Sequence, residues 1–230
     1  MYERFFKRII DFLVALVVLI VLFPLLLILS VVGMIVMKGN PFFCQPRPGK
    51  KDKDGKETIF YLVKFRTMSN ARGIDGNLLP DGQRLGKYGK FLRSTSMDEL
   101  PSLINIIFGQ LSLCGPRPQL IRDMTFMTKN QRRRHDIRPG LTGLAQVNGR
   151  NNITWEQKLA YDLQYIDKGI TFLGDLEIML KTVGKVLKRS DTVREGTVSD
   201  IDYGDWLLWK GEITEAEYNK NQMKAKQMLM

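Results

Sequence analysis

The stretch FLVALVVLIVLFPLLLILSVVGMIVM, residues 12–37, decides the fold of the N-terminal part of the chain. It contains no Asp, Glu, Lys or Arg, and it is longer than the roughly 20 apolar residues with which a helix crosses a bilayer. The sequence therefore predicts a membrane helix. A cleaved signal peptide is the first alternative, but the apolar region is too long and no small-residue cleavage site follows before Lys38.

Basic residues on both sides of this run bear on its topology; they are Arg4, Lys7 and Arg8 before it and Lys38, Arg47, Lys50, Lys51 and Lys53 after it. The positive-inside rule places both flanks on the cytoplasmic face. Pro24 lies near the middle of the run and frees the carbonyl of Ile20. We expect a re-entrant hairpin that is broken at Pro24. A straight crossing is the alternative, because many spanning helices tolerate proline.

Composition narrows the class of function. The 230 residues carry a formal net charge of +11, which indicates anionic partners such as a membrane surface, nucleic acid or phosphorylated substrates. The two cysteines lie outside any C-x-x-C spacing, so a structural zinc site is not expected. With His135 as the one histidine, zinc hydrolases and serine triads lack their usual residues, and we expect His135 to be structural. No P-loop, HExxH or GxGxxG motif occurs.

The nonapeptide RSTSMDELP, residues 93–101, contains two adjacent carboxylates, Asp98 and Glu99. Ser96 and Glu99 have the spacing of an S-x-x-E capping box, the simpler interpretation of this stretch taken alone. Pro101 would then fall past the first helical turn, so a helix that begins at Asp98 or Glu99 fits better. A helix amino end stabilises an ionised carboxylate and attracts phosphate. The pair is therefore also a candidate reactive centre for phosphoryl chemistry.

Basic residues that could neutralise a phosphate occur elsewhere in the chain. Lys64 and Arg66 alternate along the second strand of an expected β-hairpin, so they share one face. Prolines on both sides of Arg117 stiffen the backbone that presents its guanidinium, although an idle surface arginine is an equal alternative. Residues 132–134 form the densest basic run, for which a solvated face or an anionic-lipid patch is the simpler interpretation.

Two later segments are further candidates for binding a ligand or the membrane. The glycine-rich stretch 139–150 contains Gln146, Asn148 and Arg150, side chains that could hold a nucleotide base or a phosphate. Residues 175–189 have the pattern of a basic amphipathic helix, which could lie on an anionic membrane or pack on the core.

Five motifs occur in a fixed order: KFRTM (64–68), Arg93 with SMDELP (96–101), GPRP (115–118), RPGLTG (138–143) and QVNGR (146–150). Together they resemble the bacterial sugar transferases known as small monotopic phosphoglycosyl transferases. The resemblance covers about residues 1–200 and looks closest to members of protein glycosylation and capsule pathways. The small members commonly carry serine before the hairpin proline, whereas this chain has Phe23.

The resemblance implies a fold and domain organisation. We expect a mostly helical α+β protein with a re-entrant membrane helix hairpin over residues 1–39. A cytoplasmic, membrane-associated catalytic domain over residues 40–200 would carry a small β-hairpin and amphipathic interface helices. Residues 201–230 would form a C-terminal appendage. The expected location is the cytoplasmic face of the bacterial inner membrane.

The resemblance also implies an activity: transfer of a sugar 1-phosphate from a UDP-sugar to undecaprenyl phosphate, with release of UMP. We expect an N-acetylated amino sugar as the donated sugar. Asp98 would be the covalent nucleophile, and Asp98 with Glu99 would bind Mg²⁺. Arg93 would assist catalysis, and the residues expected to bind substrate are Lys64, Arg66, Arg117, Gln146, Asn148 and Arg150. An anionic phospholipid membrane is the further partner, and no nucleic acid is expected.

Two other functions fit parts of the sequence. A non-catalytic membrane tether that binds anionic lipid or nucleic acid would explain the charge, but not the paired carboxylates among arginines. A membrane phosphatase with an aspartyl intermediate would need water in place of lipid as the second acceptor.

Overall fold

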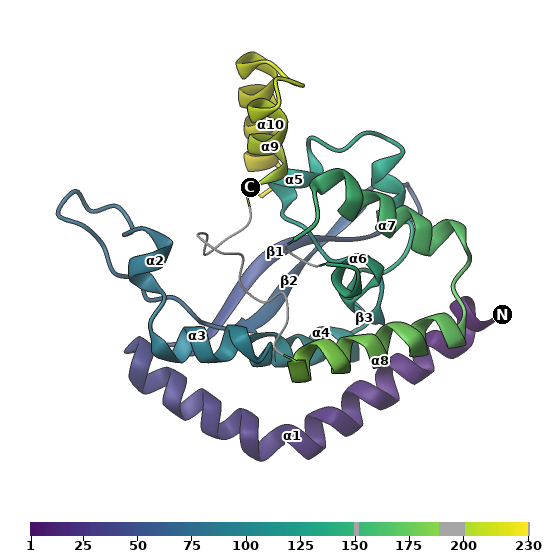
Figure 1. Cartoon of the computed structure of the whole chain (residues 1–230), viewed down its shortest axis with the longest axis horizontal. Coiled ribbons are helices and arrows are strands. Elements are labelled where there is room, and N and C mark those ends of the chain that lie inside the picture. Colours follow the sequence, from purple (N-terminus) through teal and green to yellow (C-terminus); the bar gives the residue numbers. More distant parts are fainter. Residues whose placement is uncertain (150–151, 189–200, 230) are drawn as a thin grey trace.

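The computed structural model of the chain describes residues 1–149, 152–188 and 201–229. It is mostly helical with two small sheets, the α+β organisation expected from the sequence (Figure 1). In chain order its elements are η1 (Tyr2–Phe6), α1 (Lys7–Met37), β1 (Phe42–Lys51), β2 (Glu57–Phe65), α2 (Asp81–Arg84), α3 (Lys87–Ser94), η2 (Met97–Ser102), α4 (Leu103–Ile107), β3 (Ser112–Cys114), α5 (Ile121–Met124), η3 (Gln131–His135), β4 (Gly140–Thr142), α6 (Leu144–Val147), α7 (Trp155–Asp167), α8 (Phe172–Lys188), α9 (Tyr203–Trp209) and α10 (Glu215–Gln227).

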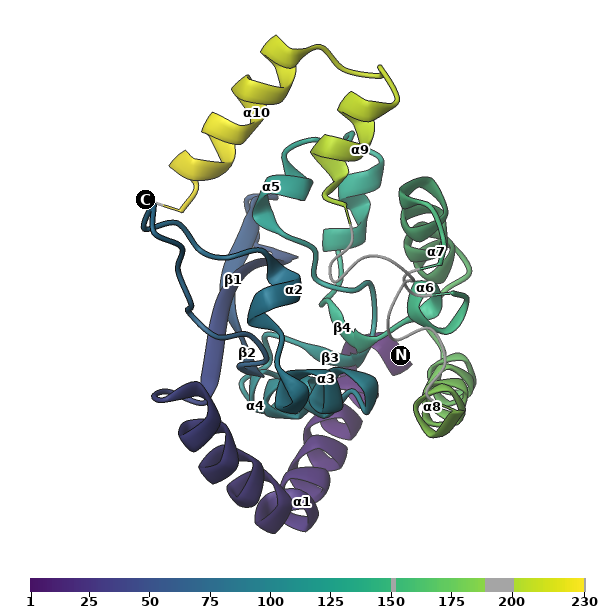
Figure 2. The same ribbon diagram turned by 60° about the vertical axis from the view of Figure 1, so that its left-hand side comes forward.

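Helix α1 contains the apolar run. Within the described part of the chain it is the one helix long and apolar enough to cross a membrane, and only 11% of its most apolar window is buried. The helix continues through Pro24 without interruption, where the sequence predicted a break. Figures 1 and 2 show it bent between its two ends, as expected when proline removes one hydrogen bond and crowds the preceding turn.

The first half of α1 is bonded to the globular part of the protein. Lys7 Nζ lies 2.5 Å from Asp175 Oδ2 of α8, and both side chains are buried. The guanidinium of Arg8 donates to the backbone carbonyls of Ile106 and Ile107 in α4, over 2.5 and 2.7 Å. These contacts fasten the start of the membrane helix to two separate helices.

The second half of α1 is attached as well. Leu29 is buried with Phe65 of β2 and Leu92 of α3, and its carbonyl accepts a hydrogen bond of 2.8 Å from the Tyr88 hydroxyl. Lys38 ends the helix in the left-handed conformation at φ 51°, and the chain turns directly into β1. Both arms of the bent helix therefore reach the same globular body (Figure 2).

Strands β1 and β2 form a two-stranded antiparallel hairpin that pairs Phe42 with Phe65. The sequence predicts the hairpin, but the prolines and glycines of residues 40–49 predict a turn-rich exit from the membrane, and that second prediction was wrong. Pro46 and Pro48 fit within β1 because each strand of a two-stranded sheet has a free edge, where a missing N–H leaves no partner unsatisfied.

Helices α3, α4 and α8 lie at the level next to α1 (Figure 1). We call the exposed apolar residues in or next to these three helices the membrane-side face; they include Phe91, Ile104, Phe108, Phe172, Leu173, Leu180 and Val183. In α4, Leu103 and Ile106 are instead buried against Ala15 of α1. Isolated exposed apolar residues are ordinary, whereas this many on three helices favours contact with lipid.

The C-terminal helices lie at the far end of the molecule from α1 (Figure 1). Tyr203 and Leu207 of α9 are buried with Trp155 and Leu159 of α7. Helix α10 packs on α5 through Ala225. These helices thus share apolar contacts with the rest of the protein.

Candidate functional site

The acidic pair stands on a short, strained turn. Ser96 adopts the left-handed conformation at φ 56°, which is unfavourable for a residue with a Cβ by about 1–2 kcal/mol. The 3₁₀ helix η2 follows, and it accommodates Pro101. Ser96 precedes η2 but makes no side-chain capping bond, so the capping box does not form. The carboxylate of Glu99 points to two cations instead.

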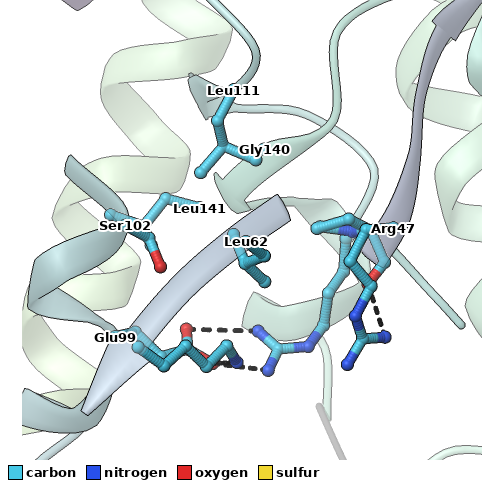
Figure 3. Close-up of a pocket in the computed structure, with 10 residues that line it drawn as sticks. Arg47, Leu62, Glu99, Ser102, Leu111, Gly140 and Leu141 are labelled. Atoms are coloured by element: carbon cyan, nitrogen blue, oxygen red, sulfur yellow. Dashed lines mark hydrogen bonds and ion pairs between the residues drawn. The ribbon is translucent and has the colours of Figure 1, made fainter. Parts of the chain in front are cut away.

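Glu99 binds a lysine from β2 and an arginine from the loop after β3. Its Oε1 accepts from Lys64 Nζ at 2.8 Å and from Arg117 Nη2 at 2.5 Å. Its Oε2 accepts from Arg117 Nη1 at 3.2 Å, which makes the arginine contact bidentate (Figure 3). We call these three residues the Glu99 centre. The structure brings them together from positions 64, 99 and 117.

Asp98 adds a second negative charge beside this centre. Burial lowers the pKa of the Lys64 ammonium, and the charges of Glu99 and Asp98 oppose that shift. Burial likewise lowers the pKa of Arg93, again opposed by Asp98. Arg93 is oriented by a bond of 3.1 Å from its Nε to the Thr67 hydroxyl. Asp98 is therefore within electrostatic reach of cations from β2 and α3.

Arg47 of β1 lines the same small cavity as the three residues of the Glu99 centre (Figure 3). The sequence analysis did not select Arg47 as a site residue. Its Nη1 donates to the Pro118 carbonyl at 3.1 Å, while its buried Nε has no partner among the described residues. Burial and the nearby charge of Arg117 lower its pKa to about 10. A signal was available, since Arg47 and Arg117 are both enclosed in a Pro-Arg-Pro tripeptide. The two tripeptides meet in space.

Backbone pairing between β3 and β4 holds the loop that presents Arg117. The parallel strands β3 and β4 align Cys114 with Thr142, and Gly115 N donates to the Thr142 carbonyl at 2.9 Å. A Cβ on Gly140 would lie 2.1 Å from the Gly115 nitrogen, so only glycine permits this approach. The glycine-rich stretch thus helps to fix the position of Arg117.

The basic run predicted as a solvated face or lipid patch is paired with carboxylates. We call Arg132, Arg133 and Arg134 the η3 cluster; the three ion pairs are Arg132–Glu57, Arg133–Asp167 and Arg134–Asp162. The prediction of an exposed face was wrong for Arg134, which is 1% exposed and also donates to the Arg117 carbonyl. His135 is buried beside Glu57, which fits a structural role.

A larger cavity of about 270 Å³ adjoins the Glu99 centre, lined by parts of η2, β4, α6 and α8. It shares Glu99, Arg117 and Leu141 with a smaller cavity of about 20 Å³ that Arg47 and Lys64 also line. Gln146 lines the larger cavity; its Nε2 donates to the Leu141 carbonyl, and its buried Oε1 has no partner among the described residues.

Among the described candidates from the sequence, Asp98, Arg93, Arg66 and Asn148 do not line either cavity. Arg66 directs its guanidinium to the carbonyl of Phe42, 3.5 Å away. Asn148 is exposed and donates to the Leu144 carbonyl at 2.8 Å. Arg150 lies outside the described residues.

The described residues hold no group of three or more His, Cys, Asp or Glu side chains that could bind a metal. Asp98 and Glu99 nevertheless suit Mg²⁺, which prefers oxygen ligands and is commonly held by one or two carboxylates together with substrate phosphates. Glu99 is already bonded to two cations, so any metal at this pair would compete with Lys64 and Arg117 for its oxygens.

In a comparison with known proteins, the chain matches a family model and also individual proteins. The family model described as "Bacterial sugar transferase" matches residues 2–189. The chain is 48% identical over 163 residues to the "Uncharacterized sugar transferase EpsL" of Bacillus subtilis (strain 168), a match that covers 70% of this chain and 78% of that protein.

Two relatives have more specific names. The chain is 38% identical over 190 residues to the UDP-glucose:undecaprenyl-phosphate glucose-1-phosphate transferase of Klebsiella pneumoniae, covering 78% of this chain and 40% of that protein. It is 31% identical over 205 residues to the undecaprenyl-phosphate galactose phosphotransferase of Salmonella typhimurium (strain LT2), covering 81% of this chain and 41% of that protein. The chain spans about two fifths of these two proteins' length.

Proposed function

The chain belongs to the bacterial sugar transferase family, and on that premise we propose that it transfers a sugar 1-phosphate from a UDP-sugar to undecaprenyl phosphate. The relatives' names support this reaction, with glucose and galactose as their sugars. An N-acetylated amino sugar stays a prediction for this chain. The observation that carries the proposal is the Glu99 centre, where Glu99 bonds Lys64 and Arg117, Arg47 lines the same cavity, and the charge of Asp98 acts on Lys64.

In the proposed reaction Asp98 is the nucleophile. One carboxylate oxygen attacks the sugar-linked phosphorus, a bond from oxygen to phosphorus forms, and the bond to the leaving UMP breaks. An oxygen of the lipid phosphate then attacks the same phosphorus. Asp98 leaves as a free carboxylate, and the product is the lipid diphosphate sugar. Covalent catalysis of this kind divides one difficult displacement into two.

A carboxylate approaches a phosphate only if nearby cations offset the repulsion between the two anions. Arg117 offers a planar fork that can bind two phosphate oxygens, and Lys64 offers a compact charge on the same side of Glu99. Arg93 acts on Asp98 from α3. We place Mg²⁺ at Asp98 and Glu99, where it would further neutralise the phosphates when bound. In this scheme Glu99 orients Lys64 and Arg117 before substrate arrives.

We further propose that α1 enters and leaves the same leaflet, with the membrane-side face on the cytoplasmic surface of the inner membrane. Support comes from Lys7 and Arg8, whose bonds to α8 and α4 hold the first half of α1 on the catalytic side. A crossing helix would have to break these bonds. In a Cys44→Ser background, a cysteine replacing Met1 should resist labelling by an impermeant reagent from the periplasmic side, and labelling from that side would contradict the proposal.

The function is tested by mixing the membrane-bound enzyme with UDP-sugar donors alone. We expect release of about one UMP per active enzyme and a mass increase on the peptide that contains Asp98. Asp98→Asn should lose both signals and all turnover, whereas Asp54→Asn, in the exposed turn of the hairpin, should keep them. Full turnover by Asp98→Asn would end the proposal. Continuous release of free sugar phosphate without lipid would instead indicate a phosphatase.

A further inference from the structure

We propose that the larger cavity is the site of the lipid substrate, holding the isoprene units nearest the phosphate and directing that phosphate to the Glu99 centre. This inference rests on the proposed function. It assigns the lipid substrate to a place in the fold, and it gives α8 the role of contacting the lipid and not the nucleotide.

The two cavities differ in the chemistry of their walls. The smaller one has room for little more than a water molecule, but it carries the cations Arg47, Lys64 and Arg117, which suit a phosphate group that lies against it. Nearly half of the residues that line the larger one are apolar; among them are Met97 and Leu100 of η2, Val147 of α6, and Met179 and Val186 of α8. A hydrocarbon chain gains free energy by burial against such a wall, at about 0.8 kcal/mol per CH₂ group.

The location of α8 gives a prenyl chain a short path from the bilayer. Leu180 and Val183 of this helix are 64% and 57% exposed. Met179 and Val186 line the cavity, and Val183 lies on the same side of the helix as both, so the apolar surface is continuous. The start of α8 is bonded to the start of α1 through Asp175 and Lys7. The apolar side chains of α8 therefore offer a prenyl chain contacts both outside and inside the cavity.

Polar groups at the cavity set the orientation of the substrate. Arg117 and Lys185 line it and can attract a phosphate, and the Thr142 and Thr182 hydroxyls lie 2.6 Å apart on the same wall. The Oε1 of Gln146, which has no partner within the part of the chain that the structure describes, is an acceptor, so it repels a phosphate. The phosphate end therefore belongs near Arg117, which the cavity shares with the Glu99 centre.

The test separates the two half-reactions. Val186→Trp should fill the α8 side of the cavity. We expect UMP release from donor alone to stay within about twofold of wild type, while the KM for undecaprenyl phosphate rises by about tenfold, equivalent to about 1.4 kcal/mol of lost binding. If UMP release from donor alone falls instead, the cavity holds the nucleotide sugar and the inference is wrong. An unchanged KM for the lipid also overturns it.

A matched lysine pair keeps the test decisive if the tryptophan variant does not fold. Lys185→Ala removes a cation that lines the cavity, whereas Lys181→Ala removes one that pairs with Glu177 on the exposed surface of the same helix. We expect a higher lipid KM for Lys185→Ala alone, with donor-only UMP release unchanged in both. Equal lipid KM values would overturn the inference. If wild type released no UMP from donor alone, the proposed function itself would fail, which is a separate result.

Discussion

The η3 cluster and the Glu99 centre are both rich in arginine, but they differ in how their charges are balanced. In the η3 cluster each arginine has a carboxylate partner of its own. In the Glu99 centre Lys64 and Arg117 share one carboxylate, and Arg47 lies beside them with a buried N–H that has no partner among the described residues. The difference separates a structural use of arginine from a binding use.

Charge density along the sequence therefore misleads, because it counts cations without their partners. The three consecutive arginines are neutralised within the fold, whereas cations distant in sequence converge around one acidic pair. An excess of cations over carboxylates in a confined space favours a phosphate ligand. Each variant described below changes a residue in or beside either the η3 cluster or the Glu99 centre.

The largest effect should come from Arg134, the member of the η3 cluster that also bonds to the Arg117 carbonyl. Arg134→Met leaves the buried carboxylate of Asp162 without its guanidinium. We expect a loss of about 3 kcal/mol in the free energy of unfolding, the low end for a broken buried pair, because the charge of Lys158 still acts on Asp162. Denaturant unfolding measures it. The double variant Arg134→Met, Asp162→Leu should recover most of the loss, and equal stability of the two variants would contradict the assignment.

Next in size is the effect of Arg117 on catalysis. Arg117→Lys keeps the charge but loses the bidentate contact with Glu99. We expect formation of the covalent adduct to slow by about 100-fold, a typical cost for one misplaced electrostatic group. Single-turnover release of UMP measures this rate. Arg122→Lys is the matched control, since Arg122 pairs with Asp202 and lines neither cavity. Equal rates for both variants would remove Arg117 from the proposed chemistry.

Part of the fold followed from local sequence pattern. The apolar run predicted a helix, and a β-hairpin was expected with Lys64 and Arg66 on its second strand; both are confirmed. The strand over Phe42–Lys51 was missed because proline is normally counted against a strand. Proline is excluded from a strand only where its missing N–H would have to pair with a neighbouring strand. Whether such a neighbour exists depends on the whole fold, so the local sequence does not show it.

The site was predictable to the extent that residue type limits chemistry. The sequence selected Asp98 and Glu99 as an acidic pair and Lys64 and Arg117 as possible phosphate contacts; the structure bonds Lys64 and Arg117 to Glu99, and the charge of Asp98 acts on Lys64. Arg47 could meet a phosphate or a lipid headgroup, but it was not selected as a site residue because its segment was assigned to a connection. Ion pairs between residues distant in sequence decided which arginines were neutralised, and single-sequence patterns do not contain that information.

His135, which follows the η3 cluster in the sequence, should make part of the stability sensitive to acid. Burial lowers the pKa of His135 to about 4, below the ordinary 6.5, so the native state excludes a proton that the unfolded state binds. The contribution of His135 to stability should fall as pH decreases from 6.5, by about 2 kcal/mol between pH 7 and 5. His135→Gln should flatten the dependence of unfolding on pH. Asp123, with its pKa raised to about 6, acts in the opposite direction in both proteins and cancels in the difference.

A smaller effect is expected at Arg47. Arg47→Met removes a cation beside the Glu99 centre while keeping a long side chain in its place. We expect the KM for the UDP-sugar to rise by about tenfold, equivalent to about 1.4 kcal/mol, with little change in the KM for the lipid phosphate. A donor titration at fixed lipid concentration measures it. A larger effect on the lipid than on the donor would exchange the roles proposed for the two cavities.

The smallest effect should come from Arg133, the most exposed member of the η3 cluster. Its pair with Asp167 has side chains that are 42% and 52% exposed, and such pairs contribute about 0–1 kcal/mol. Arg133→Ala should therefore leave unfolding, UMP release and binding to anionic phospholipid vesicles close to wild type. Vesicle sedimentation is the decisive measurement. If Arg133→Ala clearly weakened vesicle binding, this arginine would contact lipid after all, and balanced charge would no longer distinguish the structural cluster from the binding centre.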